Sequence, residues 1–498
     1  MEISGKNGNS VWMRCLLFIL LFFLSWNVHA QFFKDSSYKI ESGINFSSGS
    51  YTPFWLVSNK QGLSSVTTDH GYIRAGVFRP LEKGKKFSYS WGVDVAGAYG
   101  FTSSFVVQQA YLELQYRGWN ISIGSKERYG ELKNSSLSSG ALTFSGNARP
   151  VPQIRMGIPE YWYFKPDGLF AIKGHLAYGV FTDDSWQKDF VRNHNKYTEH
   201  VLYHSKALFV RVGNEKRLPL VFEGGLEMAA QFGGNSFNWN GSNYEKNDMP
   251  NHLRDFFRVL VPSSGDSTTP TGEQTNIYGN HVGIWHLSLS YKFDTWKLRT
   301  YYEHYFEDHS MMFWQYGWKD CLTGVEITFP RNGIIGELVY EYLGTKDQTG
   351  PVYHDSTEWI PDQISAIDNY YNHGIYTGWQ HWGMAIGNPL LISPAYNKDG
   401  NIEFKGNRVK AHHLGISGHP SQELDYRVLV SYSRNWGTYS DPFLEIEKNV
   451  STLFELSYAP RWLENWTLTG SLAFDRGDLI GNNSGGMITI RKTGVFTR

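Results

Sequence analysis

The sequence predicts an all-β protein: a single antiparallel transmembrane β-barrel of about 18 strands with long extracellular loops. Three observations lead to this prediction. The chain opens with an export signal, segments of alternating polarity recur along the remainder, and short turns alternate with long polar connections. Each observation alone is weak, but an exported polar chain built from such segments is typical of bacterial outer-membrane barrels.

The first 30 residues have the three-part pattern of a secretory signal peptide. Lys6 and Arg14 give a positively charged start, an apolar run follows at 15–24, and Ala30 ends a small-residue cleavage site. The apolar run is shorter than the roughly 20 residues that a membrane-spanning helix needs. We therefore expect residues 1–30 to be removed and residues 31–498 to form the barrel.

The composition favours a membrane protein that spans the bilayer with β-strands. Aromatic residues make up 16% of the chain, with 18 Trp, 31 Tyr and 31 Phe, while mean hydropathy is −0.40. In a barrel only alternate residues face lipid, so average hydropathy stays low, and aromatic girdles account for the many rings. The net charge of −1 gives no reason to expect a nucleic-acid partner.

Period-two segments run from one end of the predicted mature chain to the other. In Trp296–Phe306, for example, Leu298, Thr300 and Tyr302 alternate with charged and polar neighbours. We expect strands at Lys39–Ser47, Gly71–Arg79, Lys86–Ala96, Val106–Arg117, Trp119–Gly124, His286–Phe293, Trp296–Phe306, Gly333–Leu343, Arg408–Ser417, Tyr426–Arg434, Ser451–Ala459, Trp466–Asp475 and Met487–Lys492.

Three connections are much longer than the rest: Lys126–Arg155, Phe232–His281 and Thr345–Asn407. The second contains one possible helical turn at His252–Leu260. Short turns on one side and long loops on the other are the asymmetry of outer-membrane barrels. The fold contains no disulfide in this prediction, because Cys15 lies in the signal peptide and Cys321 is the remaining cysteine.

No catalytic, cofactor or metal motif stands out. The chain lacks GxSxG, HExxH, P-loop and dinucleotide fingerprints. His412 and His413 are adjacent, but neighbours on a strand point to opposite faces and cannot share one metal ion. We predict that the protein is not an enzyme and uses neither a cofactor nor a metal.

Two loop segments carry the residue types that bind sugars. In the long segment 371–408, Trp379, Gln380, His381 and Trp382 are clustered, so rings could stack on sugar faces while amide and imidazole groups bond hydroxyls. The alternative is that this loop folds on itself and packs its Trp residues against the barrel wall. We leave both interpretations open.

The second segment, 138–155, contains Pro150 and Pro152, which disfavour a central strand. Arg149 and Arg155 could bind an acidic sugar through two hydrogen bonds each. Alternatively, they could pair with carboxylates across the lumen.

Several blocks make the chain resemble the capsule assembly Wzi family, in its Bacteroides-type branch. The blocks are Thr52-Pro53-Phe54-Trp55-Leu56, Ser138-Ser139-Gly140 through Ser145-Gly146-Asn147-Ala148-Arg149-Pro150, Gly378-Trp379-Gln380-His381-Trp382-Gly383, Gly387-Asn388-Pro389-Leu390-Leu391, Asn407-Arg408-Val409-Lys410-Ala411-His412-His413-Leu414-Gly415, Tyr426-Arg427, Ser431-Tyr432 and Trp436-Gly437-Thr438-Tyr439. The resemblance implies an eighteen-stranded, lectin-like barrel that helps attach exported capsular polysaccharide to the surface of a Gram-negative cell. Members of the enteric branch carry a helical periplasmic segment before the barrel, whereas here Phe32–Ile40 leads almost directly into strand-like sequence.

We therefore expect an outer-membrane factor that binds capsular polysaccharide. Its other partners would be outer-membrane lipid and, during biogenesis, the barrel-insertion machinery. The alternatives are a porin or oligosaccharide channel and an outer-membrane hydrolase. The predicted ligand-binding residues are Asn147, Arg149, Arg155, Trp379, Gln380, His381, Trp382, Asn388, Asn407 and Arg408.

Overall fold

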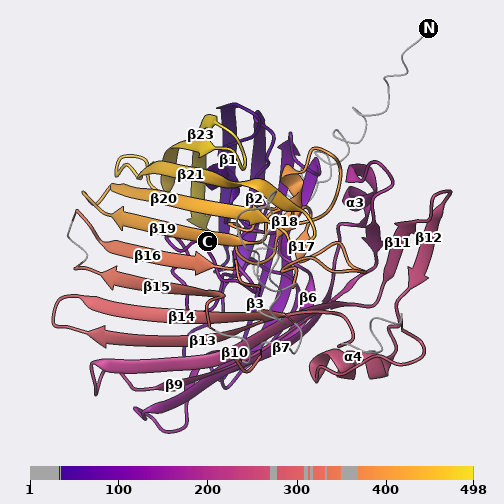
Figure 1. The fold of residues 1–498 in the computed structure, drawn as a ribbon. Coiled ribbons are helices and arrows are strands. Elements are labelled where there is room, and N and C mark those ends of the chain that lie inside the picture. Colours follow the sequence, from indigo (N-terminus) through magenta and orange to yellow (C-terminus); the bar gives the residue numbers. More distant parts are fainter. Residues whose placement is uncertain are drawn as a thin grey trace.

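A computed structural model describes residue 33 and residues 35–269, 277–307, 312–314, 318–330, 334–348 and 368–496. The predicted signal peptide lies outside the described residues. Eighteen strands form one sheet that curls into a barrel (Figure 1). They are β1 (Ser37–Ser48), β2 (His70–Arg79), β3 (Phe87–Tyr99), β4 (Phe105–Tyr116), β5 (Trp119–Ser125), β6 (Gln153–Tyr163), β7 (Phe170–Val180), β9 (Leu202–Val212), β10 (Leu220–Phe232), β13 (Asn280–Lys292), β14 (Lys297–Glu307), β15 (Cys321–Thr328), β16 (Glu337–Gly344), β19 (Val409–Gly418), β20 (Leu424–Gly437), β21 (Pro442–Tyr458), β22 (Trp466–Gly477) and β23 (Asn483–Val495).

The barrel is closed by pairing of its first and last strands. β1 pairs antiparallel with β23 along its whole length, from Ser37 opposite Val495 to Ser48 opposite Ser484. Each other strand pairs with the next barrel strand along the chain, also antiparallel. The prediction of an antiparallel barrel of about 18 strands is confirmed.

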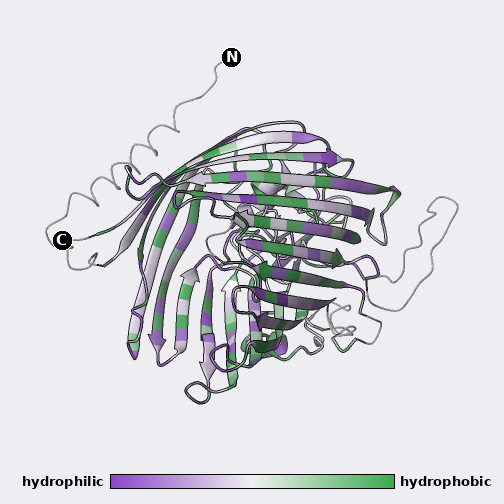
Figure 2. Ribbon diagram, turned by 90° about the vertical axis from the view of Figure 1, so that its left-hand side faces the viewer, coloured by the Kyte–Doolittle hydropathy of each residue, from purple (hydrophilic) through white to green (hydrophobic). Residues whose placement is uncertain are grey.

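Side chains alternate between the lumen and the outer surface, as Figure 2 shows by the banding of apolar and polar residues along the strands. On β1, Ile40 and Ile44 are exposed on the outside while Glu41 and Asn45 are buried in the lumen. The same pattern holds on other strands, where exposed outward residues include Ile73, Ile121, Ile123, Leu208, Phe222, Leu289, Phe454, Leu472, Ile488 and Ile490. The outer surface of the barrel is therefore apolar, as lipid contact requires.

The two ends of the barrel differ. One end of the barrel, which we name the turn end, holds the start of β1, the end of β23 and the short connections between strands. These connections are 80–86, 117–118, 164–169, 213–219, 293–296, 329–336, 419–423 and 459–465. The opposite end, the loop end, carries the connections at 49–69, 126–152, 181–201, 233–279 and 345–408. These loops hold α2 (Phe54–Val57), α3 (Asp184–Phe190), β8 (Tyr197–Glu199), β11 (Asn235–Trp239), β12 (Tyr244–Asp248), α4 (Leu253–Leu260), β17 (Gln380–His381), β18 (Met384–Ala385) and the short helix η1 (Pro394–Tyr396).

Five strands, β6, β7, β9, β10 and β15, were not among the segments predicted from alternating polarity. β10 shows the reason. Its residues Met228 to Phe232 are buried on both faces of the wall, so apolar and polar positions no longer alternate. On the inner face Ala229 packs in the cluster formed with the loops that enter the barrel; on the outer face Phe232 packs under the loop containing α4, and Met228 packs against Phe306. Periodicity fails where both faces are covered.

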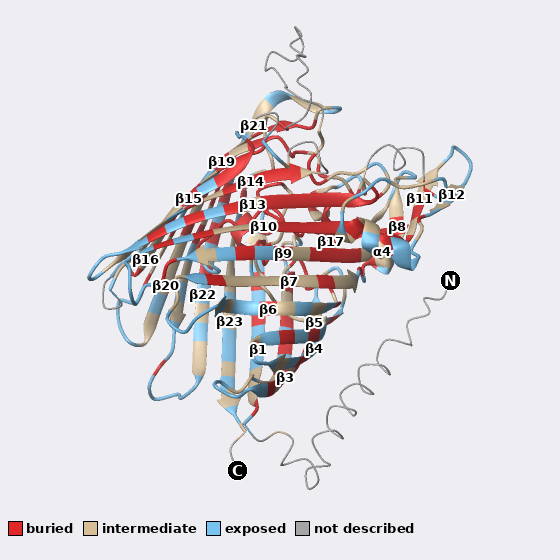
Figure 3. Ribbon diagram, turned by 90° about the horizontal axis from the view of Figure 1, so that it is seen from below, coloured by how far each residue is buried: buried red, intermediate tan, exposed pale blue. Residues whose placement is uncertain are grey.

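Three of the long loops fold into the barrel and form a plug, which we define as residues 49–69, 126–152 and 368–408. Figure 3 shows that buried residues gather in the half of the barrel nearer the loop end. One hydrophobic cluster joins the three loops to each other and to the wall. It includes Trp55, Leu137, Leu142, Trp379 and Leu391 from the plug and Val282, Tyr305, Leu322 and Val339 from the strands.

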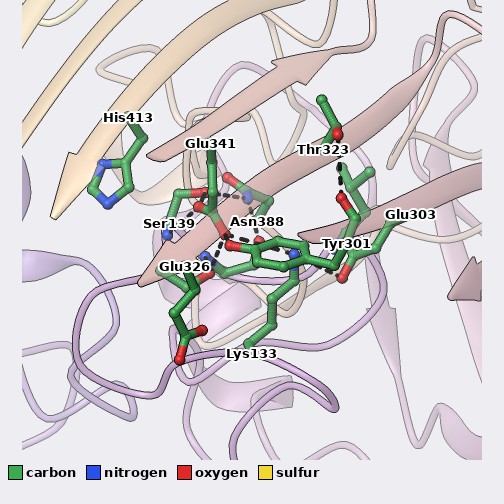
Figure 4. A network of polar contacts seen from close by, with 12 residues as sticks. Lys133, Ser139, Tyr301, Glu303, Thr323, Glu326, Glu341, Asn388 and His413 are labelled. Atoms are coloured by element: carbon green, nitrogen blue, oxygen red, sulfur yellow. Dashed lines mark hydrogen bonds and ion pairs between the residues drawn. The ribbon is translucent and has the colours of Figure 1, made fainter. Parts of the chain in front are cut away.

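A buried charge network anchors the plug to the wall (Figure 4). The Lys133 ammonium lies 3.0 Å from Glu303 and 3.6 Å from Glu341, and its side chain is 3% exposed. Glu341 also accepts hydrogen bonds from the Ser139 backbone at 2.7 Å and the Tyr301 hydroxyl at 2.6 Å. Because both carboxylates project from wall strands and the lysine and serine from the plug, the network fixes the loop at 126–152 inside the lumen.

No helix among the described residues is both long enough and apolar enough to span a membrane.

The plug network predicts a strong effect of Lys133→Met. The substitution leaves two buried carboxylates without their cation, which costs about 3–5 kcal/mol in comparable cases. We expect the protein to unfold at a lower urea concentration, measured by the change in gel mobility that barrels show on unfolding. We also expect more frequent channel openings in planar bilayers. Lys85→Met is the control, because Lys85 pairs with Glu82 at an exposed turn where such pairs contribute under about 1 kcal/mol. Equal effects of the two substitutions would contradict the anchoring role.

Candidate functional site

A small hairpin of the plug ends in an unusual tryptophan. β17 and β18 pair Gln380 with Ala385 and His381 with Met384 around the turn Trp382-Gly383. Both turn residues have left-handed backbones, with φ of 54° at Trp382 and 81° at Gly383, as a type I′ turn requires. Glycine adopts this conformation freely, and a Cβ at Gly383 would lie 2.6 Å from the Trp186 ring. A tryptophan adopts it only at a cost of about 1–2 kcal/mol, and strain of this kind concentrates at functional sites.

The Trp382 side chain lines a cleft at the loop end. The cleft has a volume of about 200 Å³. This is below the roughly 300–1,000 Å³ of pockets that enclose a small molecule, so the cleft can hold only part of a ligand. Aromatic rings from three loops border it: Phe101, Trp186, Phe190 and Trp382. Backbone and side chains of 64–67 and Thr102 supply the polar rim.

Arg149 lies at the base of this cleft. Its guanidinium carbon is 4.4 Å from the centre of the Trp382 ring, and Nη2 donates a 2.8 Å hydrogen bond to Thr102 Oγ1. The residue is 8% exposed, and its guanidinium forms no ion pair with a carboxylate among the described residues. Burial lowers the pKa of Arg149 to about 10, which still leaves it charged at neutral pH. A buried cation thus lines an aromatic cleft without a direct ion pair among the described residues, although the charge of Asp183 acts on it and partly opposes the effect of burial.

Of the predicted ligand-binding residues, the structure brings Arg149 and Trp382 together in the cleft. Seven others lie in the interior of the plug, each at most 1% exposed: Asn147, Trp379, Gln380, His381, Asn388, Asn407 and Arg408. Several of their contacts are with the plug itself. Asn147 Nδ2 donates to Ala385 O at 2.9 Å, Trp379 Nε1 to Thr143 O at 2.7 Å, and Asn388 Nδ2 to Gly140 O at 2.5 Å.

Two of these buried residues support the cleft from behind. Gln380 accepts a hydrogen bond from Gly383 N at 2.8 Å and donates one to Asp183 at 3.1 Å. The His381 ring lies 2.9 Å from the Arg149 carbonyl oxygen and 3.2 Å from Thr182 N. They fix the turn at Trp382 and the backbone of Arg149 in their observed positions.

Arg155 lies elsewhere. It belongs to β6 and faces the lumen on the turn side of the plug, where its Nη2 is 2.9 Å from His175 Nδ1 and 4.0 Å from Glu131. It lines a cavity of about 250 Å³ together with Arg128, Tyr203 and Glu227. Its partners are thus a histidine of the adjacent strand β7 and a carboxylate of the plug, and its role in ligand binding stays a prediction.

Three residues of the cleft, Phe101, Trp186 and Phe190, were not among the predicted ligand-binding residues. Each sits in a polar loop, and only the fold places the three loops side by side. An aromatic residue in a polar loop at the loop end was the available signal. His412 and His413 do point to opposite faces, since His412 is exposed beside Tyr340 while His413 is buried against Leu137.

In the part of the chain that the structure describes, no group of three or more His, Cys, Asp and Glu side chains is placed to hold a metal ion. The absence of a metal or cofactor requirement stays a prediction.

A closed antiparallel barrel with an apolar exterior, short turns at one end and long loops at the other is the architecture of outer-membrane proteins. The chain is accordingly an outer-membrane-type barrel with loops folded into its lumen. No family model matches the chain, and no curated protein matches it.

Solved structures do resemble it. Wzi of Escherichia coli, described as an outer-membrane protein involved in group 1 capsule assembly and as a carbohydrate-binding β-barrel, aligns with a TM-score of 0.54 and 12% identity, covering 95% of this chain and 87% of that one. OccAB2 of Acinetobacter baumannii aligns with a TM-score of 0.45 and 12% identity over 93% of this chain and 99% of that one. OpdQ of Pseudomonas aeruginosa aligns with a TM-score of 0.45 and 9% identity, covering 93% of this chain and 99% of that one. At these identities the first likeness concerns the fold, and the other two are too distant to bear on function.

The two neighbouring tryptophans should respond differently to substitution. Trp379→Ala creates a cavity in the plug core and should destabilise the protein by about 3–5 kcal/mol. Trp382→Asn places a residue that tolerates the left-handed turn and should leave stability unchanged or raise it by about 1 kcal/mol. Urea unfolding of the two variants, each compared with the unmodified protein, measures both effects. A large loss of stability in Trp382→Asn would show that Trp382 is a packing residue.

Proposed function

We propose that this protein is an outer-membrane, lectin-like factor that binds acidic capsular polysaccharide at the cell surface and so serves capsule assembly or attachment. The observation that carries the proposal is Arg149, a buried guanidinium without a carboxylate partner among the described residues, at the base of a cleft bordered by aromatic rings. The Bacteroides-type branch of the Wzi family, suggested by the sequence blocks, is part of this proposal.

The cleft has the chemistry of an acidic-sugar site. A planar guanidinium binds a carboxylate through two parallel hydrogen bonds, and such bonds are stronger away from bulk water. The Trp382 ring offers a flat apolar face on which the apolar face of a sugar ring can stack. Because Arg149 is already held by Thr102 and Trp382, little side-chain entropy is lost when the sugar binds.

A cleft of this small volume suits a polymer better than a free sugar. One sugar unit in so small a site binds weakly, but a capsular chain repeats its unit many times and meets many copies of the protein in the membrane. The effective concentration of the second unit is then high, and overall retention exceeds the affinity of one site. Binding is an equilibrium in which no covalent bond is made or broken.

The orientation follows from the fold. Outer-membrane barrels keep their short turns in the periplasm and their long loops outside the cell. The loop end with its cleft would therefore face the capsule. The predicted signal peptide and the barrel-insertion machinery would deliver the chain to this location.

A channel for oligosaccharides is the second candidate, and the charged cavity around Arg155 favours it. This cavity lies on the turn side of the plug and is lined by polar and charged groups, as transport lumens are. Conductance in planar bilayers separates the two: a large ohmic pore in the unmodified protein favours a channel, and a closed state favours a surface binder.

Substitutions in the cleft should reduce the affinity for acidic polysaccharide. With purified protein in detergent, capsular polysaccharide from the same organism and polygalacturonate should bind saturably, and carboxyl-reduced polygalacturonate more weakly. Arg149→Gln should lower affinity for the acidic polymers about 10- to 100-fold, as expected for a hydrogen bond to a charged group of about 1.5–3 kcal/mol, and should abolish the preference over the reduced polymer. Trp382→Asn should weaken binding of both forms.

Arg192→Gln is the control for charge, since Arg192 is an exposed arginine at the same end of the barrel. This substitution should change binding little. Added salt should weaken the binding of the acidic polymers and leave that of the carboxyl-reduced polymer unchanged. Equal losses in Arg149→Gln and Arg192→Gln would show nonspecific attraction to positive charge. Saturable binding that neither cleft substitution affects would place the site elsewhere.

A further inference from the structure

One segment of the loop at 233–279 leaves the loop end and folds back over the outer wall of the barrel. It contains α4, which lies outside the ring of strands, beside the loop-end part of β9 (Figures 1 and 3). On β9, Tyr203 stacks on plug residue Trp379 and therefore faces inward, whereas Leu208 is 59% exposed on the outside. Lys206, two residues from Leu208, also faces outward.

Lys206 holds α4 against the wall. Its ammonium donates to the carbonyl oxygens of Val259 at 2.9 Å and Leu260 at 2.6 Å, the last residues of the helix. The cation thereby satisfies carbonyl groups that a helix leaves without partners at its C-terminus. Tyr178 on β7 adds a 2.8 Å hydrogen bond to Phe256 O.

An apolar cluster seals the same contact. Val259 of α4 packs with Phe232 of β10, Met249 and Tyr278, each at most 4% exposed, and Phe256 packs on the cluster's edge. Beneath this cover lie outward-facing polar side chains of the wall, among them His204 and His281. Without α4 these groups and Lys206 would meet lipid, where ionisable side chains are costly.

The height of α4 on the barrel places it at membrane level. Val212 ends β9 at the turn end, opposite the exposed Phe170 of β7. Lys206 lies six residues further along β9, and a rise of about 3.3 Å per residue at a tilt of about 40° sets it about 15 Å higher. The apolar belt of such barrels is about 25 Å tall, so the end of α4 falls within it.

The face of α4 turned away from the wall is apolar. Leu253, Phe257 and Val261 recur every four residues and are 75%, 62% and 69% exposed. The charged residues lie to the side, where Arg258 pairs with Asp255 and Asp266. A single apolar stripe with its charges paired at one edge is the pattern of a helix lying in a membrane interface.

We propose that α4 is a lipid-contacting helix, with Leu253, Phe257 and Val261 against acyl chains of the outer leaflet. The stripe continues the apolar surface that Leu208 and Phe222 form below it on the barrel, so membrane lipid is its occupant. The helix fills the gap in the lipid-facing belt where the wall carries polar groups.

Depth-sensitive fluorescence tests the proposal. Phe257→Cys is labelled with an environment-sensitive fluorophore and reconstituted in phosphatidylcholine vesicles, some containing a nitroxide near the top of the acyl chain. We expect the nitroxide lipid to quench the label about as strongly as it quenches a label at Leu208→Cys on the lipid face, and aqueous iodide to quench it little. The unmodified protein controls for background labelling, because Cys321 is buried.

Ser242→Cys at the exposed tip between β11 and β12 is the matched control and should show the opposite pattern. Strong iodide quenching at Phe257→Cys would overturn the proposal, because the helix would then face water. Disulfide-linked dimers of Phe257→Cys that persist on dilution with excess lipid would also overturn it, because the stripe would then bind a second copy. Heat-modified gel mobility confirms that each variant is folded.

Discussion

The rest of the structure depends on the pairing of β1 with β23. In lipid, each backbone N–H and C=O must find a partner within the protein, and an open sheet would expose two unpaired edges. The antiparallel register from Ser37 opposite Val495 to Ser48 opposite Ser484 removes both edges. Closure also gives the chain an inside and an outside, and the period-two alternation of side chains then assigns each residue to lipid or lumen.

A barrel of 18 strands is wide enough to enclose water, and the chain uses that space for folded loops. The plug behaves as a small interior core, with aliphatic and aromatic side chains packed between segments far apart in the sequence. Buried charges, led by Lys133 between Glu303 and Glu341, hold it in register with the wall. The plug in turn positions the cleft, since Trp382 and Arg149 are both carried by plug loops. The contacts that hold the plug in the lumen therefore also hold the cleft residues in place.

On the outer surface of the barrel, a loop likewise covers polar groups of the wall. Where the outer wall carries Lys206, His204 and His281, α4 covers them and presents Leu253 and Phe257 in their place. The loops of the loop end thus occupy three places: the plug lies in the lumen, the cleft lies at the loop end, and α4 lies against the outer wall.

Sequence by itself determined the barrel, because alternation of side chains along a strand is a local property that survives in any tertiary context. It also placed Arg149 and Trp382 among the predicted ligand-binding residues, which stays a prediction. It could not separate Trp382 from Trp379, since both are tryptophans in one loop and only packing buries the second at 0% exposure. The convergence of Arg149 with Trp382, the burial of Asn147 and Asn388, and the placement of Phe101 and Trp186 depend on contacts between residues separated by up to several hundred positions. Local pattern carries no information on such contacts, so the tertiary structure alone decided them.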